Sequence, residues 1–315
     1  MDNLIAIDLG YGDIKVCYKN KLFKFPNAVS KKGITINRFE SIAEKVNSNE
    51  YLFNDKKYIV GDKVNNAYET RDFELLYKHA PLLIYHALKL AGVDTTRKDL
   101  VLATGLSVLN INEVNRFCER IKKVYVNNES IEFAEIKIRP QGRGIFDSYN
   151  KDKNGLVYVI DIGFNTLDIL PYKDGVGLSD GCFANTKGAN IIINQLVNIL
   201  SNNFPKIDFT EQKAKEIFIN GYIEIAGEKI DFQNEIQELK SDYTEYLINM
   251  LYTKNAILYE ANKVIFSGGG AYFLDKLLVK NLVKTADFSD IPYEFANVRG
   301  YYEYYKNTYT SKATK

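Results

Sequence analysis

The sequence predicts an α/β protein built from two copies of one domain, with a ligand-binding cleft between the copies. The pattern Ile-Asp-aliphatic-Gly-aromatic occurs twice, at residues 7–11 and 160–164. Each copy ends an apolar run, and three strands, a helix, a strand and a helix are expected in the same order in both halves. A chain of 315 residues is also long enough to bury two cores. A duplicated domain is the simplest architecture that this order allows.

In the first half, apolar segments bounded by turn residues predict strands. The expected strands are residues 4–9, 14–18, 22–25, a hairpin at 51–60, 100–103 and 131–138. Asn54 and Asp55 supply the bend of the hairpin, because Asn and Asp tolerate turn conformations. The expected helices are residues 73–91 and 112–123, where apolar residues recur at helical spacing. Pro81 interrupts the first of these helices and Gly92 ends it.

The second half restarts at the Asn154-Gly155 turn and repeats the pattern. The expected strands are residues 156–160, 166–172, 177–183 and 263–266. The expected helices are residues 189–200, 210–219, 233–262 and 299–309. The last helix carries Tyr301, Tyr304 and Tyr305 on one face, which we expect to pack back on the first half.

These elements suggest two domains with a discontinuous boundary. Domain I is expected to comprise residues 1–150 and the C-terminal segment 292–315, with a small inserted subdomain at about residues 30–70, where the sequence is irregular and charged. Domain II is expected to comprise residues 151–291.

Composition gives no support for several classes of protein, although it does not exclude direct DNA binding. Lys and Arg number 41 against 40 Asp and Glu, so bulk charge gives no support for direct nucleic-acid binding. The three cysteines have no metal-ligand spacing, and their sparseness suits a reducing compartment. No apolar run is long enough to cross a bilayer, and the N-terminus lacks a basic signal-peptide region. We therefore expect a cytoplasmic protein with no membrane partner.

The repeated aspartates, Asp8 and Asp161, predict a metal site. Mg²⁺ gives up its water reluctantly and is usually held by one or two carboxylates together with substrate phosphates. Two strand-end carboxylates facing one cleft would hold such an ion through its waters. The alternative is that each Asp only caps its own turn.

Three glycine-rich loops predict phosphate binding. Gly10, Gly12 and Gly163 expose backbone amides and allow close approach of phosphate oxygens. Lys15 can reach back to a phosphate, or it is a solvated strand lysine. Residues 268–271 (Gly-Gly-Gly-Ala) join a strand to a helix-like run and can pass close to a ribose and α-phosphate, although such a turn alone is a weak signal.

Gln141 follows a predicted strand at the join of the two halves. A neutral amide is no strong base, but it can orient a water for in-line attack on a γ-phosphorus. The alternative is an ordinary turn in the crossing between domains. The sequence contains no Ser/His/Asp or Cys/His arrangement and no Gly-Lys-Ser/Thr phosphate loop of the Walker type.

Together these segments resemble the actin-like ATPases. Residues 7–15 are similar to their first phosphate loop, residues 159–168 to the second, and residues 267–271 to the adenosine loop. The resemblance covers essentially the whole chain in the right order. It is closest to the ParM-like plasmid-segregation actins, particularly a compact archaeal branch with stretches similar to residues 139–142 and 295–301.

The resemblance implies duplicated actin-like (ribonuclease H-like) domains with a nucleotide cleft between them, and ATP/ADP and Mg²⁺ as cofactors. It implies catalytic roles for Gln141, Asp161 and Asp8, with the two aspartates near the metal. The implied nucleotide-binding residues are Gly10, Tyr11, Gly12, Asp13, Lys15, Gly163, Phe164, Asn165, Thr166, Gly188, Lys215, Glu216, Gly268, Gly269, Gly270 and Ala271.

The sequence also departs from the family. ParM has Glu where this chain has Gln141, so the chain follows the actin pattern there. Tyr11 and Gly12 replace hydroxyl residues common in the first loop, so phosphate binding there would depend on backbone N–H groups and Lys15. Lys215 and Glu216 fall where the family contacts adenosine, or they form a solvated charge pair.

The expected function is that of a filament-forming actin-like ATPase that uses ATP and Mg²⁺. Its expected partners are further copies of itself and an adaptor protein bound to DNA, for plasmid or DNA segregation. One alternative is a non-filamentous actin-like scaffold. Another is a small-molecule kinase of the same fold, which would need a carboxylate base where this chain has Gln141.

Overall fold

The computed structural model describes residues 2–31, 49–61, 72–254 and 256–313, and it divides the chain into two compact units. Unit 1 comprises residues 1–148 and 295–315, and unit 2 comprises residues 149–294. The chain therefore leaves unit 1 once and returns to it once.

Unit 1 alternates strands with a few helices. Its elements are β1 (Leu4–Leu9), β2 (Asp13–Tyr18), β3 (Lys21–Pro26), β4 (Val29–Lys31), β5 (Glu50–Phe53), β6 (Lys56–Val60), α1 (Phe73–Ala91), β7 (Val101–Leu106), the 3-10 helix η1 (Val108–Glu113), α2 (Val114–Lys122), β8 (Lys123–Val126), β9 (Glu129–Glu132), β10 (Glu135–Pro140), α3 (Arg143–Ser148) and the C-terminal helix α8 (Ala296–Ala313).

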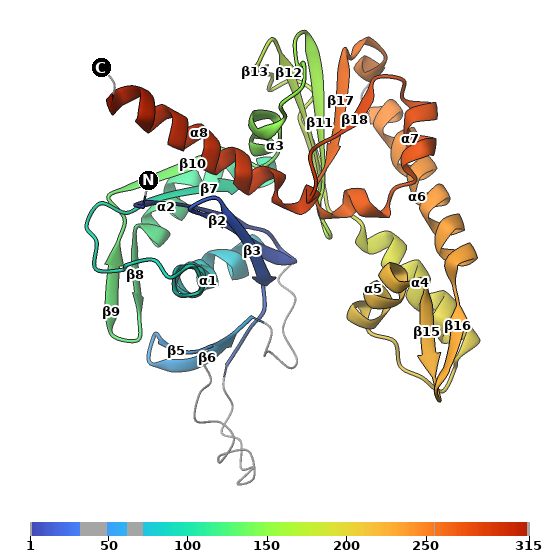
Figure 1. Ribbon diagram of the computed structural model, residues 1–315, viewed down its shortest axis with the longest axis horizontal. Helices are drawn as coiled ribbons and strands as arrows, with labels where there is room; N and C mark the ends of the chain where they lie inside the picture. The colour runs from blue at the N-terminus through green and yellow to red at the C-terminus, as the bar shows by residue number, and fades with distance from the viewer. Residues whose placement is uncertain (1, 32–48, 62–71, 255, 314–315) are drawn as a thin grey trace. The chain divides into compact units, whose positions relative to one another are not determined.

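The main sheet of unit 1 has the order β10-β7-β1-β2-β3. β1 is central, antiparallel to its hairpin partner β2 and parallel to β7. Successive β1 side chains point to opposite faces: Ile5 and Ile7 pack in the cluster that contains α1, whereas Leu4 and Ala6 pack in the cluster that contains α8. The sheet is therefore covered by α1 on one face and α8 on the other (Figure 1).

Helix α1 has the bounds that its apolar spacing and its terminating glycine predict. Asp72 caps its N-terminus by accepting a hydrogen bond from the Glu74 N–H. Gly92 ends it in the left-handed conformation at φ 64°, where its N–H reaches Leu88 and Lys89 carbonyls. Pro81 lies inside one continuous helix rather than dividing it.

The small strands of unit 1 were predicted only in part. The hairpin of β5 and β6 turns at Asn54 and Asp55, both at positive φ, as predicted. Much of the expected inserted subdomain lies outside the described residues. The single strand predicted at residues 131–138 is wrong: β9 pairs with β8 in a separate hairpin, and β10 joins the main sheet. The prediction missed the turn at Asn127 and Asn128, whose positive φ values suit a two-residue hairpin loop.

Unit 2 repeats the strand arrangement of unit 1. Its elements are β11 (Leu156–Ile162), β12 (Leu167–Lys173), β13 (Val176–Gly177), β14 (Phe183–Asn185), α4 (Asn190–Asn203), α5 (Glu211–Asn220), β15 (Tyr222–Ile225), β16 (Glu228–Asp231), α6 (Gln233–Lys254), η2 (Ala256–Glu260), β17 (Lys263–Ser267), η3 (Gly269–Phe273), α7 (Lys276–Leu282) and β18 (Ala286–Phe288), followed by η4 (Tyr293–Phe295) at the boundary.

The sheet of unit 2 has the order β13-β12-β11-β17-β18, with β14 also paired to β12. β11 is central, antiparallel to β12 and parallel to β17, which matches the position of β1 in unit 1. Equivalent strands thus place the two Asp-Gly turns at equivalent sheet positions, as a duplicated fold requires.

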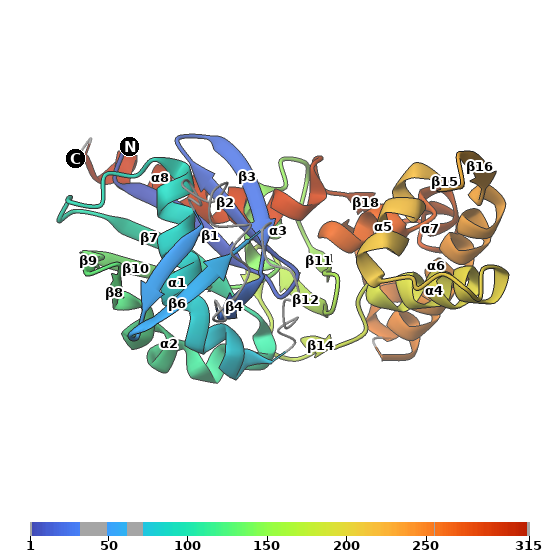
Figure 2. The same cartoon turned by 90° about the horizontal axis from the view of Figure 1, so that it is seen from below.

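Three details of unit 2 differ from the prediction. Residues 177–183 form two short strands, β13 and β14, rather than one strand. Helix α6 ends at Lys254, well before residue 262. The hairpin β15–β16, labelled in Figures 1 and 2, was missed; it turns at Ala226 and Gly227.

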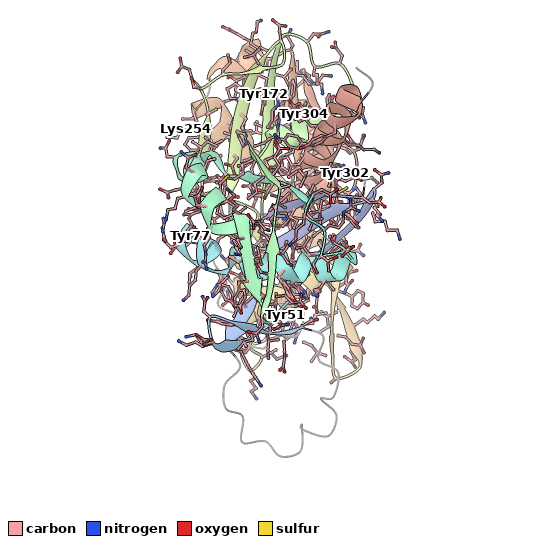
Figure 3. The ribbon with its side chains drawn as sticks, turned by 90° about the vertical axis from the view of Figure 1, so that its left-hand side faces the viewer. Tyr51, Tyr77, Tyr172, Lys254, Tyr302 and Tyr304 are labelled. Atoms are coloured by element: carbon pink, nitrogen blue, oxygen red, sulfur yellow. The ribbon has the colours of Figure 1, made fainter. Side chains whose placement is uncertain are left out.

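A buried histidine joins the β5 hairpin to α1 in unit 1. His86 is 1% exposed, and its Nδ1 shares a 2.6 Å hydrogen bond with the hydroxyl of Tyr51, which Figure 3 labels. The rings of His86 and Phe25 are perpendicular, with their centroids 4.6 Å apart. Burial lowers the pKa of His86 to about 4 and raises that of Tyr51 to about 12.

We predict that unit 1 loses stability in mild acid because His86 is buried neutral. Its folded-state pKa, about 4, lies below the ordinary 6.5, so the unfolded chain binds the proton first as the pH falls from 6.5 toward 4. The free energy of unfolding should fall by roughly 2 kcal/mol between pH 7 and pH 5 from this group. Urea denaturation at the two pH values measures it. The variant His86→Gln, which keeps an acceptor for Tyr51, should show a smaller fall; an equal fall in both proteins would contradict the assignment.

Candidate functional site

The first candidate loop joins β1 to β2 in unit 1. Asp8 is 4% exposed and lies directly opposite Lys15 in the antiparallel register, so both side chains project from the same face. A Cβ built at Gly10 would lie only 2.7 Å from Lys15 Nζ, which shows that the ammonium group lies over the loop backbone. The loop therefore combines a carboxylate, an ammonium group and a backbone that a side chain would block.

Two asparagines that sequence reasoning missed hold this loop. Asn27 is buried, its N–H donates to the Gly12 carbonyl at 2.9 Å, and its Nδ2 donates to the Gly10 carbonyl at 2.9 Å. Asn110 Nδ2 donates to the Tyr11 hydroxyl at 3.2 Å. Only the position of Asn27 directly after Pro26 hinted at a turn; nothing local indicates the bond from Asn110, because it spans 99 residues.

Gln141 lies next to the first loop. Its backbone N–H donates to the Leu106 carbonyl at 2.8 Å, which continues the pairing of β10 with β7. Its side-chain Nε2 donates to Asp8 Oδ1 at 3.0 Å. The structure thus brings together two of the expected catalytic residues, Gln141 and Asp8, across 133 residues of sequence.

The second candidate loop joins β11 to β12 in unit 2. Asp161 is 9% exposed and lies directly opposite Asp168, which is 1% exposed. A Cβ added at Gly268 would lie 2.5 Å from Asp161 Oδ1, so the carboxylate reaches the glycine-rich turn that follows β17. Two buried carboxylates on one face of a hairpin repel each other, and a nearby cation would offset that repulsion.

The second loop lies on the N-terminus of α4. The N–H of Ala189 donates to the Gly163 carbonyl at 3.1 Å, and that of Asn190 donates to the Phe164 carbonyl at 2.8 Å. A Cβ at Gly188 would come within 2.6 Å of both carbonyl oxygens, so glycine is required for this contact. Gly163 in turn donates to the carbonyl of Thr166, which closes the turn.

The glycine-rich turn after β17 fits tightly against β11. Gly268 has φ +84°, and a Cβ there would lie 2.4 Å from the Ile162 carbonyl oxygen. A Cβ at Gly270 would lie 2.3 Å from the Ile162 side chain. A Cβ at Gly269 would make only an ordinary 3.6 Å contact with Glu294, and Ala271 is fully buried in the core.

Of the three remaining predicted nucleotide-binding residues, one contacts a candidate loop and two pair with other side chains. Lys215 of α5 places Nζ 3.4 Å from the centroid of the Phe164 ring, so the structure brings it to the second loop as a cation–π contact. Glu216 instead is exposed and accepts a hydrogen bond from Gln212 of its own helix. Asp13, the first residue of β2, forms a partly exposed ion pair of 3.8 Å with Lys24.

The residues present fit an anionic, metal-bound ligand. Each of the three loops has a glycine at which a Cβ would meet other atoms of the protein, so the backbone turns tightly there without a side chain. Glycine-rich turns of this kind are common at phosphate sites. Asn165 is buried in the second loop, and its Oδ1 accepts no hydrogen bond from the described residues. The described chain holds no group of three or more His, Cys, Asp or Glu side chains placed to ligate a metal directly. Asp8 and Asp161 are oxygen donors of the kind that hydrated Mg²⁺ takes.

Comparisons with known families and structures agree with this duplicated fold. Residues 6–144 match the model of the actin-like protein N-terminal domain, and residues 159–280 match that of the archaeal actin homologue MreB-like C-terminal domain. No curated protein sequence matches the chain.

Several solved structures share the fold over nearly their whole length. The native crystal structure of an archaeal actin homologue has a TM-score of 0.81 at 21% identity and covers 96% of this chain and 99% of its own. The same homologue in complex with ADP has a TM-score of 0.78 at 19% identity, with 96% and 99% covered. A 15-stranded ParM filament from Clostridium botulinum has a TM-score of 0.76 at 24% identity, with 98% and 100% covered.

The glycine-rich turn provides a matched pair of variants. We expect Gly268→Ala to lower the free energy of unfolding by more than about 1 kcal/mol and to weaken binding of Mg-ATP, because its φ and its contact with Ile162 both exclude a Cβ. Gly269→Ala, in the same turn, should change both quantities little. Thermal unfolding and calorimetric titration with Mg-ATP measure the two effects. Equal losses in both variants would contradict this account of the turn.

Proposed function

Since the chain belongs to the actin-like superfamily, we propose that it is a filament-forming ATPase that binds ATP and ADP with Mg²⁺. The observation that carries the proposal is the hydrogen bond between Gln141 and Asp8, which places a neutral amide beside the carboxylate of the first loop. That pairing suits a residue that orients water near a metal-bound phosphate. The proposed biological use is segregation of plasmid or other DNA through an adaptor protein.

Each unit would contribute one phosphate loop to nucleotide binding. In unit 1, Lys15 and the backbone around Gly10 would contact phosphate oxygens, and in unit 2 the backbone around Gly163 would do the same. Asp8 and Asp161 would hold Mg²⁺ through its water shell, and the ion when bound would neutralise phosphate charge. Lys215 would lie near the nucleoside, beside Phe164.

In the proposed hydrolysis, Gln141 positions the water that attacks the γ-phosphorus. A new bond forms between the water oxygen and phosphorus while the bond to the β–γ bridging oxygen breaks. The products are ADP and inorganic phosphate, with one water proton released to solvent. Gln141 accepts no proton, because its amide is not basic, so its contribution is orientation and hydrogen bonding.

The alternatives are weaker on specific grounds. A small-molecule kinase needs a carboxylate base against the acceptor hydroxyl, and the side chain paired with Asp8 is an amide. Binding to DNA through an adaptor agrees with a net charge of +1, which gives no electrostatic attraction for nucleic acid. A non-filamentous scaffold would bind ATP without forming polymer.

No helix among the described residues combines the length and apolar character needed to cross a membrane.

The filament proposal is tested with purified protein in Mg-ATP, in Mg-ADP and without nucleotide. We expect light scattering to rise with Mg-ATP, and negative-stain electron microscopy of the same samples to show filaments. Binding of ATP without polymer at any concentration would contradict filament formation and favour the scaffold.

The catalytic role of Gln141 gives a separate prediction. Gln141→Ala should reduce phosphate release roughly a hundredfold while leaving the affinity for Mg-ATP near that of the wild type, because the amide acts on water rather than on the nucleotide. Filaments of the variant should persist longer after ATP addition. Asp8→Ala is the comparison variant and should weaken nucleotide binding itself. Unchanged phosphate release by Gln141→Ala would contradict the assigned role.

A further inference from the structure

The turn that carries Gln141 is held by a residue from the other end of unit 1. Asn297, in the first turn of α8, is 6% exposed, and its Oδ1 accepts a hydrogen bond from the Gly142 N–H at 2.8 Å. Gly142 is itself buried and has φ +86°. The bond spans 155 residues and is buried, so solvent does not compete for the donor.

This hydrogen bond restrains the peptide group of Gln141 directly. The Gly142 N–H belongs to the peptide plane whose carbonyl is that of Gln141, and a trans peptide is planar. Fixing the direction of the Gly142 N–H therefore fixes the peptide group that follows the Gln141 Cα. The peptide group that precedes this Cα is held by the hydrogen bond from the Gln141 N–H to the Leu106 carbonyl. With both flanking peptides held, the Gln141 side chain is directed toward Asp8.

Helix α8 is in turn fixed against α3 by backbone contact. A Cβ built at Gly300 would lie 1.9 Å from the Gly144 carbonyl oxygen, and one at Gly144 would lie 2.2 Å from the Asn297 carbonyl oxygen. Ser148 Oγ adds a 3.0 Å hydrogen bond to the Ala296 carbonyl. At these two glycines the backbones of α3 and α8 are in direct contact, which restricts movement of Asn297 relative to the turn that carries Gln141.

We propose that Asn297 is a positioning residue for Gln141. Its buried side-chain oxygen holds the peptide group between Gln141 and Gly142, and this peptide group in turn orients the Gln141 side chain, whose amide is proposed to position the water. This inference rests on the proposed function, because it assumes that Gln141 acts on ATP hydrolysis. Asn297 lies two residues after Phe295, where the chain re-enters unit 1. The position of Gln141 is thereby tied to the segment through which the chain returns from unit 2.

The test compares three variants of the full-length protein. Asn297→Ala removes the acceptor and should lower kcat for ATP hydrolysis roughly ten- to a hundredfold, with the Kd for Mg-ATP near the wild-type value. Asn297→Asp keeps an acceptor oxygen and should restore most of kcat. Val298→Ala is the control: Val298 is fully buried in α8 and packs with the sheet, so it should lower Tm without a selective loss of kcat. The rate of phosphate release is divided by the number of subunits that sediment as filaments, so that a change in the amount of polymer does not appear as a change in kcat.

A double-mutant cycle with Gln141→Ala distinguishes positioning from a general structural role. If Asn297 acts through Gln141, Asn297→Ala should lower kcat in the wild-type background and have almost no effect in the Gln141→Ala background. An equal loss in both backgrounds, or no loss in either, would overturn the inference. Should Asn297→Ala not fold, Asn297→Ser, whose hydroxyl is too short to reach Gly142, takes its place in the cycle.

The same experiment separates this inference from the proposed function. If the wild-type protein hydrolyses ATP and Gln141→Ala is slow, the proposed function holds, and the behaviour of Asn297→Ala alone decides the inference. If the wild-type protein binds no ATP or does not hydrolyse it, the proposed function itself is wrong.

Discussion

The structure depends on one costly arrangement made twice: a carboxylate buried at the end of a central strand. Removing a charge from water is expensive unless a partner compensates it. In unit 1 Lys15 lies opposite Asp8 and the Gln141 amide donates to it. In unit 2 the residue opposite Asp161 is Asp168, a second carboxylate in place of a lysine. The two copies of one motif have therefore become electrostatically different, and the chain turns sharply beside each carboxylate on glycine.

The sequence allowed prediction of those parts of the fold that local patterns determine. The apolar runs that became β1 and β11, the hairpin bend at Asn54 and the end of α1 at Gly92 each have a nearby physical cause. The missed hairpins β8–β9 and β15–β16 are short and mostly exposed, so they lack the apolar runs that indicate a buried strand. Each of these strands is only four residues long, which is too short for alternation of buried and exposed residues to give a clear strand signal.

The candidate site also has a part that local sequence predicts and a part that it does not. The loops around Gly10, Gly163 and Gly268 were predictable because each is a continuous stretch with a local steric requirement. The residues that hold the loops were not, because Asn110 and Asn297 reach their partners across 99 and 155 residues. An asparagine in a helix has no feature in its own neighbourhood that reveals which distant backbone group it will bond.

The place of α8 in unit 1 has a consequence for how the protein is made. The face of the sheet formed by Leu4, Ala6 and Val101 is covered by Tyr301 and other residues of α8. A ribosome synthesises the chain from the N-terminus, so these side chains stay without their cover until the whole of unit 2 has been translated. Unit 2 is continuous in sequence and can complete its core first. Unit 1, although it is synthesised first, therefore cannot complete its core until the chain is finished, and its uncovered sheet face exposes apolar side chains that favour aggregation until then.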